Sequence, residues 1–136
     1  AAQGIKTFST GIFASHWLEM AKTRLYNEDA SATWTLHRIF RDLLSILSPI
    51  CPFFTHHLST TLYEKSSVEV DVFPESPITG TQSWTEKTDD LVEFNSVVWK
   101  AKKDAGVSLA APISGHKVPS SLKEIEAALV AMHKLE

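Results

Sequence analysis

The chain has 136 residues, of which 43% are hydrophobic, so it can bury the core of one domain but is too short for two independent cores. Its formal net charge of -3 at pH 7 excludes binding to nucleic acid through bulk positive charge, so any contact with RNA has to be local. A single cysteine excludes an internal disulfide, and the apolar runs fall short of the ~18 residues that span a membrane, so we expect a cytoplasmic protein without membrane contact.

The two ends of the chain indicate a piece of a larger protein. The sequence opens with Ala1 rather than Met, and it closes with Leu135 and Glu136, a pair typical of a cloning site in front of a tag. We therefore expect residues 1–136 to form a single domain, the C-terminal fragment of a longer chain, with residues 135–136 as a remnant of cloning.

The first predicted helix runs from about residue 10 to residue 28. Phe13, Trp17, Met20, Ala21 and Leu25 recur three or four positions apart, which is the spacing of one helical face. This apolar face predicts a helix that packs on the core of the domain.

Two further helices are expected to meet at a sharp corner. Asp29 or Ser31 can accept hydrogen bonds from the first turn of the second helix, whose apolar side chains repeat at helical period up to Leu47. Pro49 removes a backbone donor and ends this helix, whereas Pro52 fits the first turn of the next one.

The third helix is predicted over residues 52–63. Phe54, Leu58 and Leu62 lie four positions apart, so they share one face of an amphipathic, partly exposed helix. After it the period changes to two over residues 66–73, where valines alternate with acidic residues, and this alternation predicts a short extended segment. A surface loop rich in Pro, Ser and Thr is expected to follow.

Two possible capping boxes mark the starts of the last two helices. Ser83 with Glu86 opens a helix that ends at Gly106 in a left-handed stop, and Ser121 with Glu124 opens the final helix. The side chains expected to face inward are Leu91, Phe94, Val98 and Ala101 or Ala105 in the first of these helices, and Leu122, Ile125, Leu129 and Met132 in the second. The whole pattern predicts an all-α antiparallel helical bundle with one short extended segment.

Basic side chains gather on three of the predicted helices, where they could meet at one end of the bundle. Arg38 and Arg41 are three positions apart and share a helical face, and Trp34 lies one turn before Arg38. An aromatic plane beside a cation suits the splayed bases and phosphates of RNA. The alternative is that the tryptophans anchor the core and the charges are solvated. The candidate RNA-binding residues are Lys22, Arg24, Trp34, Arg38, Arg41, Lys100, Lys102 and Lys103.

No residue is expected to be catalytic or to bind a metal or cofactor. His56 and His57 are adjacent, so on a helix they diverge by about 100° and cannot share one ion. Glu69 and Asp71 fit the wet face of the extended segment better than an acid/base pair. Cys51 has no basic neighbour in sequence, which favours a buried, unreactive thiol.

The order of four segments resembles a known family. Lys22–Glu28, Leu47–Phe54, Val68–Glu75 and Val98–Ile113 follow one another as in the anticodon-binding domain of class I aminoacyl-tRNA synthetases, and the valyl enzyme of the archaeal-like branch looks closest. The similarity runs from about residue 11 to residue 113. His56-His57 departs from the family, whose members commonly carry acidic residues at this position, so contacts made through those carboxylates are not expected here.

The resemblance implies a helical module that holds the anticodon stem-loop of a tRNA. The parent enzyme would join valine to its tRNA with ATP through a catalytic domain on the same chain, and this module would itself catalyse nothing. The isoleucyl and leucyl enzymes, which share the bundle, are alternatives, as is a stand-alone helical module that binds a protein through the His56-His57 helix. The family domain begins with further helices, and the groove left without them could support a dimer.

Overall fold

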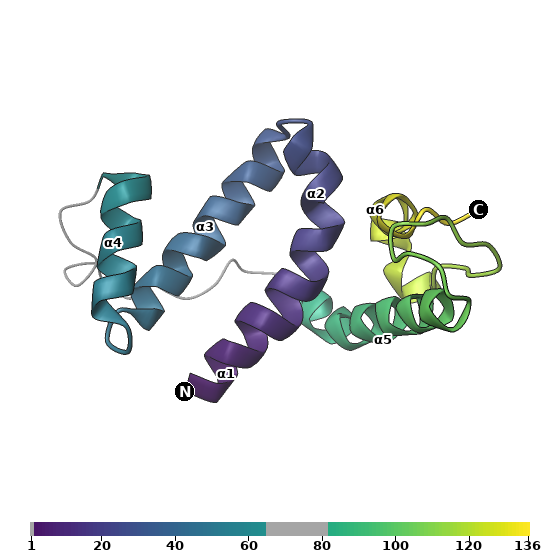
Figure 1. Cartoon of the computed structure of the whole chain (residues 1–136), viewed down its shortest axis with the longest axis horizontal. Helices are drawn as coiled ribbons and strands as arrows, with labels where there is room; N and C mark the ends of the chain where they lie inside the picture. Colours follow the sequence, from purple (N-terminus) through teal and green to yellow (C-terminus); the bar gives the residue numbers. More distant parts are fainter. Residues whose placement is uncertain (1, 65–81) are drawn as a thin grey trace. The chain divides into compact units, whose positions relative to one another are not determined.

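The computed structural model describes residues 2–64 and 82–136, with side chains from residue 85 onward in the second range. The chain divides into two compact units, residues 1–27 with 79–136 and residues 28–78 (Figure 1). Most of the described residues are helical, which confirms the predicted all-α class. The expected extended segment at residues 66–73 and the loop after it lie outside the described residues.

The first unit begins with three helical segments that continue one another without a break (Figure 1). They are α1 (Ala2–Lys6), the π-helix η1 (Thr7–Leu18) and α2 (Glu19–Tyr26). The predicted helix is therefore confirmed, but it starts earlier and is wound more widely over η1. The wider winding fits the side chains, since Ser15 Oγ donates to the carbonyl oxygen of Thr10 five positions back, at 2.6 Å.

The core of the first unit lies between α5 (Gln82–Asp104), the 3-10 helix η2 (Ser120–Ile125) and α6 (Glu126–His133). The buried apolar side chains there are Phe94, Val98, Leu122 and Leu129, with Met20 of α2 packed against them. These four residues, which we expected to face inward, are thus fully buried. The other expected positions are half-buried or, at Ala105, exposed; the half-buried ones are Leu91, Ala101, Ile125 and Met132.

The ends of these helices follow the predictions only in part. Gly106 follows the end of α5 and has a φ of 68°, in the left-handed region, which confirms the predicted left-handed stop of this helix. The capping box at Ser121 is wrong, because Pro119 is the N-cap of η2, no side-chain bond caps this helix, and Ser121 lies inside its first turn. Ser83 likewise lies inside α5, which begins at Gln82.

The second unit pairs α3 (Ala30–Leu47) with α4 (Pro52–Tyr63) (Figure 1). The Asp29 carboxylate accepts from the backbone N–H of Ala32 at 2.9 Å, which confirms the predicted N-cap. At the corner the N–H of Ile50 donates to the carbonyl oxygen of Leu47 at 2.9 Å, and Pro52 then opens α4.

The buried face of α4 differs from the predicted one. Its fully buried side chains are Thr55 and Ser59, whereas Phe54 and Leu62 are more than half exposed. Thr55 can be buried because its hydroxyl donates to the carbonyl oxygen of Cys51 at 3.0 Å, so no polar atom is left without a partner. The expectation of a buried thiol at Cys51 is also wrong, because this residue is exposed.

No helix in the described ranges, residues 2–64 and 82–136, is long and apolar enough to cross a membrane.

The cap of α3 gives a first test. Replacing Asp29 with Ala removes the acceptor of the Ala32 N–H, so we expect the free energy of unfolding to fall by about 1 kcal/mol. Urea unfolding followed by far-UV circular dichroism measures it. Asp29→Asn keeps a capping oxygen and is the control, expected to retain most of the stability. Equal unfolding free energies for Asp29→Ala and the unchanged chain would contradict the role of this cap.

Candidate nucleic-acid interface

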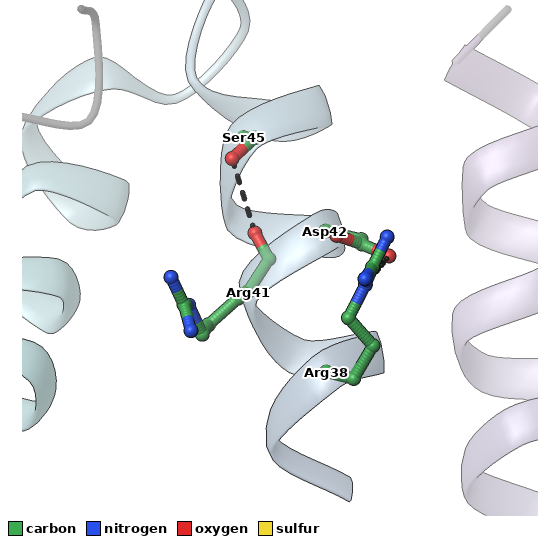
Figure 2. A network of polar contacts seen from close by, with 4 residues as sticks. All are labelled: Arg38, Arg41, Asp42 and Ser45. Atoms are coloured by element: carbon green, nitrogen blue, oxygen red, sulfur yellow. Dashed lines mark hydrogen bonds and ion pairs between the residues drawn. The ribbon is translucent and has the colours of Figure 1, made fainter. Parts of the chain in front are cut away.

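Three of the predicted RNA-binding residues lie on α3, within the second unit. Arg38 and Arg41 leave the helix in different directions, and their guanidinium groups point to opposite sides of it (Figure 2). Arg38 Nε lies 3.0 Å from Asp42 Oδ2, one turn further along α3. The expected shared face is therefore not what the side chains form, because each arginine follows a different partner.

Arg41 is positioned by an aromatic ring of α4. Its guanidinium carbon lies 5.6 Å from the centroid of the Tyr63 ring, a cation–π arrangement. The Tyr63 hydroxyl is 3.0 Å from Nδ1 of His37, so this ring is fixed from α3 as well. Burial raises the pKa of Tyr63, and the charge of Arg41 acts against this shift. A guanidinium that lies over a ring keeps its N–H donors in its own plane, where a phosphate can accept from them.

Trp34 presents an aromatic surface on the same helix. Its side chain is 60% exposed, so Trp34 is not an anchor of the core. Trp99 behaves in the opposite way, because it is half-buried and its ring centroid lies 5.2 Å from that of His16. Of the two tryptophans that precede a cation by one turn, only Trp34 is open enough to stack on a base.

The other predicted cations belong to the first unit. Lys22 is exposed and its ammonium lies 2.7 Å from Glu19, a hydrogen bond that raises the pKa of this lysine. Arg24 is exposed and lines a pocket of about 370 Å³, together with Trp17, Met20 and Leu91. Lys100 and Lys103 are exposed near the end of α5. These four side chains are exposed, which a contact with RNA requires.

Lys102 differs from the expectation made from the sequence. Its side chain is fully buried, and Nζ donates to the carbonyl oxygens of Leu109 and His133, each at 2.8 Å. Burial lowers the pKa of Lys102, and the nearby charge of Lys134 lowers it further. An ammonium held in this way cannot contact a phosphate, so we remove Lys102 from the interface.

The sequence did not predict a buried series of side-chain hydrogen bonds that lies near Lys102. The Asn95 amide nitrogen donates to Nδ1 of His16 at 2.9 Å, and Nε2 of His133 donates to the Asn95 carbonyl oxygen at 2.7 Å. The three residues are far apart along the chain, so no local spacing connects them. One signal was present, since Asn95 and Lys102 fall on the apolar stripe of α5 that includes Phe94 and Val98.

The hydrogen bond from Asn95 requires Nδ1 of His16 to be unprotonated, whereas Nε2 of His133 can donate to Asn95 in either protonation state of its ring. Burial lowers the pKa of His16. Burial also lowers the pKa of His133 to about 4, and electrostatic interaction with Lys102, His116 and His16 lowers it further. Among the residues that the structure describes, no group of three or more metal-ligating side chains is present.

The depressed pKa values make stability depend on pH. His133 is neutral in the folded chain down to about pH 4 but gains a proton near pH 6.5 when unfolded, so its contribution is present above pH 6.5 and lost as the pH falls. We expect the free energy of unfolding to drop by about 3 kcal/mol between pH 7 and pH 4 from this group, and His16 adds to the drop.

Urea unfolding at a series of pH values measures this dependence. His133→Gln removes the titrating ring and should flatten the curve, whereas His57→Gln, at an exposed position of α4, should leave it unchanged. A His133→Gln chain that loses as much stability as the unchanged chain would contradict the assignment.

Comparisons with known proteins identify the family. The family model described as "Anticodon-binding domain of tRNA ligase" matches residues 1–117. The valine--tRNA ligase of Nanoarchaeum equitans is 30% identical over 99% of this chain and 18% of its own length. That of Aeropyrum pernix is 36% identical over 90% of the chain and 16% of its own length. That of Sulfurisphaera tokodaii is 45% identical over 45% of the chain.

The chain thus spans less than a fifth of the length of the first two of these relatives. No solved structure matches it significantly. Because the family model covers most of the chain, from residue 1 to residue 117, the chain belongs to the family of anticodon-binding domains of tRNA ligases.

Proposed function

We propose that this chain is the module of a valine--tRNA ligase that binds the anticodon arm of its tRNA. The family supports the task of anticodon binding, and relatives named as valine--tRNA ligases support the amino acid. In the complete cytoplasmic enzyme, a catalytic domain on the same chain would activate valine with ATP and transfer it to the tRNA. The module contributes affinity and discrimination. The dimer considered from the sequence stays a prediction.

The observation that carries the proposal is the exposed cluster on α3. Trp34 offers a stacking surface, and Arg41 is exposed and stands over the ring of Tyr63. Stacking on unpaired bases and charge contacts with phosphates are the two ways in which proteins bind RNA loops. The residues that we propose to contact tRNA are Lys22, Arg24, Trp34, Arg38, Arg41, Lys100 and Lys103.

The net charge of -3 sets the character of this binding. Without a bulk positive field, affinity depends on a few local ion contacts, and each releases counterions from the RNA. Four phosphate contacts would weaken binding on the order of 50-fold between 50 and 200 mM salt. A module that binds a protein partner instead would have no salt-dependent affinity for RNA.

Trp34 tests the stacking contact. Trp34→Ala removes the exposed ring, and we expect the dissociation constant for the isolated anticodon stem-loop of tRNA(Val) to rise about 5- to 150-fold. Fluorescence anisotropy with a labelled stem-loop measures it. Phe53→Ala is a matched control, because it removes an aromatic side chain that is 91% exposed in the same unit. Equal losses in the two variants would mean that Trp34 is not a specific stacking site.

Arg41 tests the phosphate contact. Arg41→Gln removes the charge over Tyr63, so we expect weaker binding and a plot of log affinity against log salt that is shallower by about one unit. Lys123→Gln, on η2 in the first unit and beside Glu126, is the control and should change neither quantity. A variant with reduced affinity but an unchanged salt slope would assign Arg41 to holding Tyr63 rather than to the phosphate.

The amino acid itself is tested by competition. Unlabelled anticodon stem-loops of the valine, isoleucine and leucine tRNAs are added to the labelled complex, and the valine stem-loop is expected to compete best. Preference for another stem-loop would move the chain to the isoleucyl or leucyl enzyme, while absence of binding to all three would favour the protein-interaction module.

A further inference from the structure

His133, the last residue of α6, is held twice by α5. Its Nε2 donates to the Asn95 carbonyl oxygen at 2.7 Å, and its own carbonyl oxygen accepts from Nζ of Lys102 at 2.8 Å. All three side chains are fully buried. The end of α6 is therefore fixed through one imidazole and one ammonium.

The same ammonium holds a second segment. Lys102 also donates to the carbonyl oxygen of Leu109, in the stretch that follows α5. Further along, the N–H of Ile113 donates to the carbonyl oxygen of Lys134 at 3.1 Å, and the N–H of Glu136 donates to that of Ile113 at 3.1 Å. Residues 107–113 and the end of the chain are thus joined to each other and to one buried cation.

The described residues around His133 offer no hydrogen-bond acceptor for a second ring proton. Its Nδ1 is buried and has no hydrogen-bond partner among the described residues. The titratable groups that act on it are Lys102 from α5, His16 from η1 and His116 from the stretch before η2, and Lys134 is its neighbour in the chain. The rings of Phe94 and Trp99 meet its ring edge to face, each with centroids 5.8 Å apart. A protonated imidazole would set a new donor against apolar rings and a like charge.

We propose that Asn95, Lys102 and His133 form a proton-operated latch that joins α6 and residues 107–113 to α5 while His133 is neutral and releases them when its imidazole is protonated. Both segments come free together because both depend on Lys102. Release of α6, a helix of eight residues, exposes less core than global unfolding, so the local opening costs less free energy than global unfolding when the charge is added.

The direction of the pH response follows from the burial. The closed latch lowers the pKa of His133 to about 4, while an open, hydrated ring returns to about 6.5. Acidification from pH 7 to pH 4 therefore raises the ratio of open to closed molecules by about 100-fold. The latch is closed at neutral pH and opens in acid.

Hydrogen exchange of backbone amides, resolved by NMR on the full chain, tests the latch. Rates are measured between pH 7 and pH 4.5 and corrected for the intrinsic effect of pH. We expect the protection of residues 107–113 and of α6 to fall at acid pH while that of residues 91–99 in α5 stays high. Constant protection of α6, or equal loss in α5 and α6, would overturn the proposal.

Two variants distinguish the effect of protonating His133 from a general loss of structure. His133→Gln can still donate to Asn95 but carries no charge, so its α6 should exchange independently of pH. His57→Gln, at an exposed position, should respond as the unchanged chain does. Full pH dependence in His133→Gln would overturn the proposal.

Two further measurements test the proposal even if the His133→Gln variant does not fold. In the unchanged chain, the His133 ring resonances should titrate over the pH range in which α6 loses protection. A titration completed while α6 stays protected would overturn the latch. Lys102→Met keeps the apolar stem without the ammonium, and it should release residues 107–113 already at pH 7. Undiminished protection of this segment would show that Lys102 is not the link.

Discussion

The first unit depends on one constraint, the burial of an ammonium and three other polar side chains among apolar ones. An unpartnered charge in such a place is strongly destabilising, so Lys102 has to be surrounded by acceptors. The carbonyl oxygens that serve come from Leu109 and from His133 at the end of α6. The path of the chain after α5 and the position of α6 are thus set by the need to solvate one lysine from within. Packing of Leu122 and Leu129 on Phe94 and Val98 completes the same arrangement.

Where local chemistry decides the structure, the sequence predicts it well. The proline corner before α4, the Asp29 cap and the Gly106 stop each follow from the residue at that position and its immediate neighbours. Local patterns also fail, as at the capping box expected at Ser121 and the buried thiol expected at Cys51. Other failures concern polar residues that are buried through partners far along the chain or within their own helix. Thr55 is the clearest example. Its hydroxyl donates to a backbone carbonyl oxygen at the start of its own helix, so a helix face that carries polar side chains is nevertheless buried.

The candidate interface shows the same division. Its residue types and helices could be read from the sequence, but exposure and direction could not. Trp34 and Trp99 each precede a cation by one turn, yet only Trp99 meets imidazole rings that bury it. Likewise, Arg38 turns toward Asp42 while Arg41 lies over Tyr63, so two similar side chains diverge (Figure 2). Such differences come from the partner, which a helical spacing does not specify.

The division of the chain has a consequence for the order in which it folds. The second unit is one continuous stretch, residues 28–78, and its contact between His37 and Tyr63 closes over 26 residues. The first unit is made from both ends of the chain, and its contact between His16 and Asn95 spans 79 residues. During synthesis α3 and α4 can therefore pair while the ribosome has yet to make α5 and α6. The helix formed by α1, η1 and α2 precedes α5 and α6 in the sequence, so the face that packs on them stays uncovered by them until they have been made.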